Sequence, residues 1–211
     1  KKSNIEVLLN YSVEGLEDAS GYRDTYGKTL NAIHFAKENP SVRAMCVKFT
    51  GYAHTDIWVK LQAKQELTQA EQQEFLQAKS YIDKLCSEAV ECDVHLYVDA
   101  EESWFQDSID ELVDEMMEKY NKKEAIIYNT LQMYLTDRLS YLRHLLDHSS
   151  SKNYFPGIKL VRGAYAEKER ETAMLEKKIS PVYPTKEQTD LAFNEALELC
   201  WTMRQSWCFS F

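Results

Sequence analysis

Short, nearly continuous apolar runs alternate with longer amphipathic segments along most of the chain. Apolar runs of four to eight residues are typical of strands that are buried on both faces of a parallel sheet. The pattern therefore predicts five strands, over Ile5–Asn10, Ala44–Phe49, Val94–Asp99, Ala125–Asn129 and Ile158–Arg162.

The segments between these runs place apolar residues at helical spacing. They predict helices over Tyr22–Glu38, Thr68–Glu91, Asp107–Tyr120 and Leu131–His148, and another from Thr185 through Leu199. The second and the last of these begin with a capping box, in which Thr68 is followed by Glu71 and Thr185 by Gln188. The polar run 166–170 opens one more helix after the fifth strand.

Strict alternation of strands and helices indicates an α/β fold with a parallel sheet. A doubly wound sheet that binds a dinucleotide would carry a glycine-rich turn, but the chain has 6 glycines and no G-x-G-x-x-G motif. Polar residues gather instead after the ends of several strands, which is where (β/α)8 barrels of the TIM type build their sites. The sequence therefore favours a barrel.

A complete barrel needs about 250 residues, and this chain has 211. We therefore expect an incomplete barrel, with about the first five βα units over residues 1–199 and further residues lost upstream. The tail over 200–211 holds two of the 4 Trp and two of the 5 Cys, with no return strand. We expect it to be an aberrant or truncated end.

The overall composition excludes several classes of protein. A formal net charge of -9 argues against a nucleic-acid-binding protein, which would need clustered Lys and Arg. No apolar run is long enough to predict a transmembrane segment. The 5 Cys show no C-x-x-C spacing and are typical of reduced thiols in an intracellular protein. Cys and His spacing predicts no metal site.

Charged residues end the second and third strands. Lys48 follows an apolar run, so its ammonium either holds a substrate carboxylate or reaches solvent at the rim of the sheet. Asp99 ends the next run and is followed by two more acids, Glu101 and Glu102. These carboxylates are suited to binding a metal, to acting as a base, or to accepting hydrogen bonds from a ligand and its cationic partners. Asp99 is the strongest candidate of the three.

Amides and cations follow the last two strands. Asn129 and Gln132 are suited either to hydrogen-bonding a heteroaromatic ring or to capping the following helix. Lys159 and Arg162 lead into Gly163, Ala164 and Tyr165. A cation beside an electron-accepting ring stabilises the charge that builds up during reduction. A guanidinium beside a glycine suits a phosphate, because glycine permits close approach of the backbone.

Three blocks of sequence resemble the signature of the proline dehydrogenase family: Val98–Gln106, Tyr128–Tyr134 and Ile158–Tyr165. Their order and spacing match too, and the single-domain bacterial form is nearest, although mitochondrial relatives share the blocks. The resemblance implies a distorted (β/α)8 barrel that binds FAD and oxidises L-proline to Δ1-pyrroline-5-carboxylate. It also implies hydride transfer to flavin N5 and transfer of electrons to a membrane quinone. The location would then be a bacterial cytoplasm with peripheral membrane contact, or the mitochondrion in a eukaryote.

The resemblance also implies roles for individual residues. Lys48 would hold the proline carboxylate, Asp99 would order the cations of the site, and Tyr165 would lie against substrate and flavin. Gln132 and Lys159 would contact the isoalloxazine ring. Three further residues would line the cofactor, namely Arg162, Gly163 and Ala164.

One feature of the family is missing from this sequence. The family clamps the proline carboxylate with two adjacent arginines on a late helix, and this chain has no Arg-Arg pair. We therefore expect the 211-residue chain to be inactive by itself. Two alternatives stay open, a non-catalytic barrel remnant and a Schiff-base enzyme that uses Lys48 or Lys159.

Overall fold

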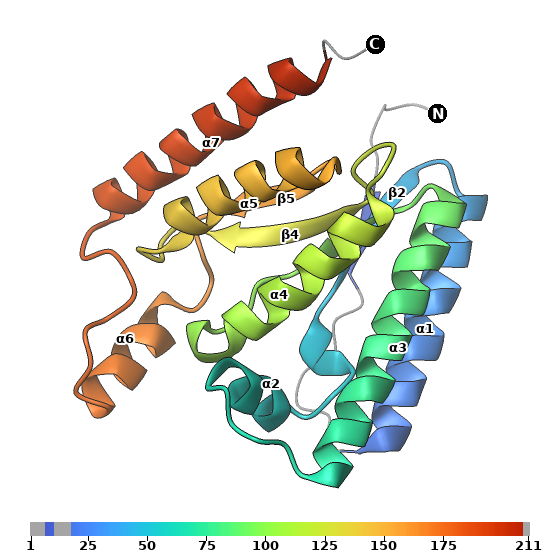
Figure 1. The fold of residues 1–211 in the computed structure, drawn as a ribbon, viewed down its shortest axis with the longest axis horizontal. Coiled ribbons are helices and arrows are strands. Elements are labelled where there is room, and N and C mark those ends of the chain that lie inside the picture. The colour runs from blue at the N-terminus through green and yellow to red at the C-terminus, as the bar shows by residue number, and fades with distance from the viewer. Residues whose placement is uncertain (1–6, 11–17, 209–211) are drawn as a thin grey trace.

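The computed structural model describes residues 7–10 and 18–208, with the backbone alone for residues 204–208. Strands and helices alternate through this part of the chain (Figure 1). The strands are β1 (Val7–Asn10), β2 (Val42–Val47), β3 (His95–Val98), β4 (Ile127–Gln132) and β5 (Ile158–Val161). The helices are α1 (Ala19–Glu38), η1 (Phe49–Gly51, a 3-10 turn), α2 (Thr55–Gln62), α3 (Gln69–Cys92), α4 (Ser103–Tyr120), α5 (Arg138–Lys152), α6 (Ala166–Leu175) and α7 (Lys186–Cys208).

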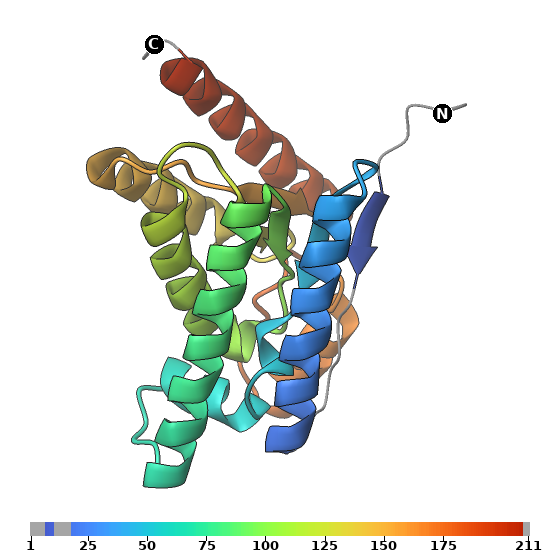
Figure 2. The same cartoon turned by 90° about the vertical axis from the view of Figure 1, so that its right-hand side faces the viewer.

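The five strands form one parallel sheet in the order β1-β2-β3-β4-β5. Neighbouring helices contact each other in the same order, α1 with α3, α3 with α4, α4 with α5 and α5 with α7. These helices therefore form a single layer on one face of the sheet, with α1 and α3 side by side in both views (Figure 2). Helices on one face only are the barrel arrangement, because a doubly wound sheet has helices on both faces.

The sheet is open in the part of the chain that the structure describes. Each of β1 and β5 pairs with one neighbour there, and neither pairs with the other. The observed fold is thus an α/β fold with a five-stranded parallel sheet, which is consistent with the predicted barrel but not closed into one.

The main core lies between the sheet and the helical layer. Met45, Leu96 and Ile127 have 0–1% exposed surface and point from their strands into this layer. Helix α2, which the sequence did not predict, adds Ile57 and Trp58 to the same core. It has only eight residues, too few for a clear amphipathic repeat.

Several predicted boundaries differ from the observed ones by a few residues, and the largest error is at the start of the helix after β4. The helix predicted over Leu131–His148 begins only at Arg138, because β4 continues through Gln132. That extension pairs with β5 in register, Leu131 with Leu160 and Gln132 with Val161. Leu131 is fully buried beside α5 and α7, so its apolar side chain serves the strand and not a helix.

Both capping boxes are present. At the start of α3, Thr68 accepts from the Glu71 N–H while the Glu71 carboxylate accepts from the Thr68 N–H. Thr185 and Gln188 exchange the same two hydrogen bonds at the start of α7, each at 3.3 Å. Helix α7 runs on through residue 208, whereas residues 5–6 of the first predicted strand and residues 209–211 of the tail lie outside the described residues.

Candidate active site

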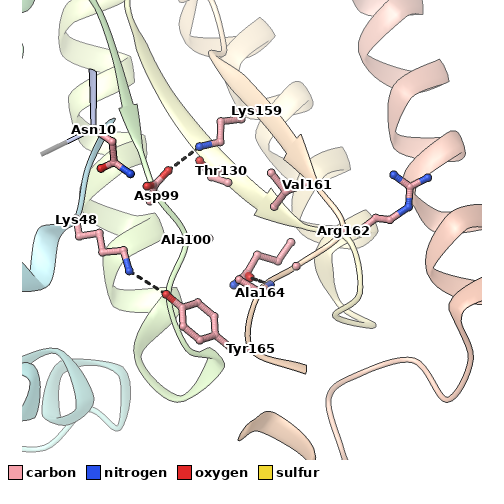
Figure 3. Close-up of a pocket in the computed structure, with 12 residues that line it drawn as sticks. Asn10, Lys48, Asp99, Ala100, Thr130, Lys159, Val161, Arg162, Ala164 and Tyr165 are labelled. Atoms are coloured by element: carbon pink, nitrogen blue, oxygen red, sulfur yellow. Dashed lines mark hydrogen bonds and ion pairs between the residues drawn. The ribbon is translucent and has the colours of Figure 1, made fainter. Parts of the chain in front are cut away.

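A pocket of about 430 Å³ opens at the carboxyl ends of β1 to β5 (Figure 3). Its lining includes all eight residues that the sequence analysis assigned to the site: Lys48, Asp99, Gln132, Lys159, Arg162, Gly163, Ala164 and Tyr165. The carboxyl ends of parallel strands meet at one edge of a sheet, which is why residues up to 117 positions apart in sequence come together here.

An ion pair crosses the floor of the pocket. Lys159 Nζ on β5 lies 2.6 Å from Asp99 Oδ1 after β3, and both side chains are partly buried. The Cys46 thiol on β2 lies 3.8 Å from the same ammonium. Burial, together with the neighbouring Asp99 carboxylate, raises the pKa of that thiol to about 11. The predicted role of Asp99, ordering a cation of the site, thus has a visible partner in Lys159.

A second cation lies at the other side of the pocket. Lys48 Nζ donates a hydrogen bond of 2.9 Å to the Tyr165 hydroxyl, and the two side chains point toward each other (Figure 3). Lys48 follows β2 and Tyr165 precedes α6, so this contact joins the first and last strand-end loops of the site. The ammonium remains at the pocket surface and does not extend away from the protein.

Gln132 braces the loops around the pocket. Its Nε2 donates to the Glu101 carbonyl at 2.7 Å, and its Oε1 accepts from the Ala164 N–H at 2.9 Å. The side chain therefore joins the loop after β3 to the loop after β5. It does not cap α5, which begins six residues later at Arg138.

Arg162 contributes less to the pocket than the sequence suggested. Its Nε lies 2.5 Å from Asp190 Oδ1, and its guanidinium lies 4.6 Å from the centre of the Phe193 ring. Both partners belong to α7, and Figure 3 shows the side chain directed toward that helix, away from Lys48 and Tyr165. Arg162 borders the pocket, while its guanidinium pairs with Asp190 of α7.

Gly163 is required by its surroundings. Its φ is +140°, a conformation that side chains disfavour. A Cβ at this position would also lie 1.3 Å from Cδ1 of Tyr134, which is buried. The chain can therefore turn from β5 into α6 beside the Tyr134 ring only with glycine.

Glu101 is a buried acid that the sequence analysis ranked behind Asp99. It is 3% exposed and accepts a 2.6 Å hydrogen bond from Thr50 Oγ1. Burial raises its pKa to about 7, against the lowering effects of Thr50 and of the Lys48 charge. Its position three residues after the end of β3 was the only signal in the sequence, because its burial depends on the packing of η1 against it.

Thr130 is a further pocket residue that sequence reasoning missed. It lies on β4, is 4% exposed, and its Oγ1 has no hydrogen-bond partner within the described part of the chain. Buried hydroxyls are nearly always hydrogen-bonded, so an unpartnered one that lines a pocket indicates a ligand or water there. Thr130 stands beside Lys159 in Figure 3.

The family of the chain follows from its match to known sequences. A family model described as proline dehydrogenase matches residues 1–211, which is the whole chain. The chain belongs to the proline dehydrogenase family. Among curated relatives, "Proline dehydrogenase 1, mitochondrial" of Dictyostelium discoideum is 29% identical over 93% of this chain and 41% of its own length. The carbapenem antibiotics biosynthesis protein CarD of Pectobacterium carotovorum is 28% identical over 93% of this chain and 51% of its own length.

Solved structures agree with the fold of this proline dehydrogenase family member. Proline utilization A of Bradyrhizobium japonicum, as its D779W mutant, superposes with a TM-score of 0.80 at 18% identity and covers 96% of this chain. Proline utilization A from Bdellovibrio bacteriovorus, inactivated by N-propargylglycine, gives 0.77 at 15% identity. The chain spans about half or less of the curated relatives cited above and about a fifth of these two structures.

Proposed function

We propose that this chain provides the cofactor site and part of the substrate site of an FAD-dependent enzyme that oxidises L-proline to Δ1-pyrroline-5-carboxylate. The observation that carries the proposal is the convergence of eight strand-end residues on one pocket, in a chain that belongs to the proline dehydrogenase family. Lys48, Lys159 and the Gln132 amide are donors suited to an anionic, electron-accepting ligand.

The residues present fit a flavin ring. Lys159 and Thr130, whose Oγ1 is unpartnered in the described part of the chain, are neighbours in the pocket lining. Gln132 is held in place by its two backbone contacts. The chemistry that FAD supplies when bound is acceptance of the hydride from the carbon next to the proline nitrogen, at flavin N5. The Asp99 carboxylate holds Lys159 in a position from which its charge stabilises an electron-rich ring.

Proline would bind on the Lys48 side of the pocket. Lys48 is the pocket cation suited to its carboxylate, because it lies beside Tyr165, across the pocket from the Lys159–Asp99 pair. Tyr165 holds the Lys48 ammonium through its hydroxyl and forms the adjacent wall. We assign Gly163 and Ala164 to the cofactor side, with Gly163 allowing the tight turn and the Ala164 N–H fixing Gln132.

We further propose that the 211-residue chain binds FAD but does not turn over proline by itself. A single lysine is a weak clamp for a carboxylate compared with bidentate arginine contacts, and the sequence has no adjacent arginine pair. In the active enzyme we assign the reduced flavin a membrane quinone as its electron acceptor. Within residues 7–10 and 18–208, no helix has both the length and the apolar character needed to cross a bilayer.

The location of the protein follows from the same proposal. The relatives from Dictyostelium discoideum and Homo sapiens are named mitochondrial. We propose the mitochondrion if the source is a eukaryote, and a bacterial cytoplasm with peripheral membrane contact otherwise. The family match offers no support for the Schiff-base alternative. The non-catalytic alternative is tested by the experiment below.

The test is an absorbance spectrum of the purified chain after loading with FAD and removal of free cofactor, recorded before and after anaerobic addition of L-proline. We expect a bound flavin spectrum that does not bleach. Bleaching would establish proline oxidation and contradict the proposed inactivity. A chain that retains no FAD would contradict the cofactor assignment.

A variant pair makes the test specific to the pocket. Lys159→Met should lose most of its bound FAD, because it removes the cation held by Asp99. Lys79→Met is the matched control, since Lys79 on α3 pairs with the exposed Glu115 of α4 and does not line the pocket. Equal FAD retention by both variants would place the flavin elsewhere.

A further inference from the structure

Three potential metal ligands gather where α1 packs against α3. His34 lies on α1, and Glu88 and Cys92 lie one turn apart on α3. His34 Nε2 is 2.8 Å from Glu88 Oε1, and Cys92 Sγ is 3.5 Å from the same oxygen. All three ligand atoms lie within 4.8 Å of one another. The two helices run side by side in Figures 1 and 2.

We propose that His34, Glu88 and Cys92 form a binding site for a zinc-type divalent cation, with water as the fourth ligand. An imidazole nitrogen, a carboxylate oxygen and a thiolate are the ligand types that zinc takes in proteins. A thiolate also disfavours magnesium and calcium, which select oxygen ligands. Three protein ligands leave one coordination position open to solvent.

The present geometry is close to what a tetrahedral ion requires. Bonds of about 2.0–2.3 Å at a tetrahedral angle separate the ligand atoms by roughly 3.3–3.7 Å. The Cys92–Glu88 separation of 3.5 Å already falls in this range, and the His34–Glu88 separation of 2.8 Å must widen by less than about 1 Å. The His34 side chain is 49% exposed, so it is free to make this small movement.

The charged groups at the site have opposing effects on cation binding. The Cys92 thiol is buried, which raises its pKa, and the adjacent Glu88 carboxylate raises it further. Binding replaces the thiol proton with the cation and releases that proton to solvent. Lys37, three residues after His34 on α1, carries a positive charge near both Glu88 and Cys92, and it opposes a cation. Its side chain is exposed and able to turn away.

The position of the site predicts what the ion does. Cys92 ends α3 just before β3, at the edge of the sheet opposite the pocket. A cation there joins α1 to α3 and has no contact with the residues that line the pocket. Bound metal should therefore raise the unfolding temperature of the chain and leave FAD retention unchanged.

The experiment is a titration of the reduced, metal-free chain with Co²⁺, followed by displacement with Zn²⁺. One Co²⁺ per chain should produce the charge-transfer absorption of a cobalt–thiolate bond, and Zn²⁺ should abolish it. Mutating residues that only support a metal's ligands lowers metal affinity roughly 10–100-fold. His34→Ala and Cys92→Ser each remove a ligand, so each should weaken Co²⁺ binding by more than this. Lys37→Ala should tighten it.

Matched controls separate loss of a ligand from loss of the fold. Cys200→Ser removes a half-buried thiol on α7 and should leave the cobalt absorption unchanged. His34→Ala changes an exposed side chain and should leave the fold intact. It therefore tests the loss of a metal ligand even if Cys92→Ser does not fold. No cobalt absorption in the wild-type chain would overturn the proposal, as would full absorption in a folded His34→Ala variant.

Discussion

The two faces of the sheet are built from alternate residues of the same strands, yet their chemistry is opposite. On the helix-covered face, Leu96 and Val98 are almost completely buried in the apolar core. On the other face of the same region, Tyr97, Asp99 and Lys159 are partly buried and make polar or aromatic contacts with one another. Successive strand residues point to opposite faces, so each strand serves both purposes.

The two faces of the sheet contribute to different properties of the molecule. The covered face contributes apolar burial, which each strand shares with the helix above it. The open face contributes polar and ionic groups, among them the Lys159–Asp99 pair beside Tyr97. Substitutions at the covered face should therefore act mainly on stability, and substitutions at the open face mainly on ligand binding. Two buried polar sites, the Arg138–Asp110 pair and Glu101, are exceptions that test this rule.

The largest effect is expected at a polar exception in the helical layer that covers the sheet. Arg138 Nη1 lies 2.5 Å from Asp110 Oδ2, and both side chains are 4% exposed. Arg138→Leu leaves a buried carboxylate without its cation and should lower the free energy of unfolding by about 3–5 kcal/mol. Arg143→Leu, on the same helix, breaks an exposed pair with Glu195 and should cost no more than about 1 kcal/mol. Equal urea midpoints for the two variants would contradict this difference.

Leu96 and Tyr97 are adjacent in β3 and point to opposite faces, so substitutions there compare the contribution of each face to stability. Leu96→Ala creates a cavity in the core and should lower the free energy of unfolding by about 2–5 kcal/mol. Tyr97→Phe removes one hydroxyl from the open face and should change it by less than about 0.5 kcal/mol. Urea unfolding of both variants measures the contrast. A Tyr97→Phe loss as large as that of Leu96→Ala would show that the open face also carries the fold.

The buried acid beside the pocket should make stability depend on pH. The pKa of Glu101 is raised from 4.5 to about 7 in the folded chain, mainly by burial. Its contribution is fully present below pH 4.5 and is lost as the pH rises through about 7, because the buried carboxyl must then ionise. This change in pKa corresponds to about 3 kcal/mol.

Glu101→Gln should remove that part of the pH dependence, measured as unfolding free energy from pH 4 to 8. The partly buried Asp114, whose pKa is also raised to about 7, should leave a residual slope in the variant. An unchanged slope would mean that Glu101 is ionised in the folded chain throughout this range.

The smallest effect is expected at the turn from β5. Gly163→Ala places a Cβ against the Tyr134 ring at a φ of +140° and should cost about 1–3 kcal/mol as well as weaken FAD retention. Gly27→Ala is the matched control, because nothing lies within 4 Å of its Cβ position on α1. There the same substitution should stabilise the chain by about 0.5–1 kcal/mol. Thermal unfolding would detect the opposite signs, and equal signs would contradict the steric argument.

Much of the fold and the site could be predicted from sequence because both rest on local patterns. Apolar runs located all five strands, and capping boxes located the starts of α3 and α7. The eight predicted site residues line one pocket, since residues that follow parallel strands must meet at one edge. The end of β4 was misjudged, because Leu131 has the same apolar character in a strand as in a helix.

The sequence by itself determined the order of strands and helices and the chemical groups available at the strand ends, because both depend on neighbouring residues. Tertiary structure decided the partners. It paired the Arg162 guanidinium with Asp190 of α7, buried Glu101, and brought His34 beside Glu88, 54 residues away. Contacts between distant segments follow from how helices pack on the sheet, and no local pattern of residues specifies them.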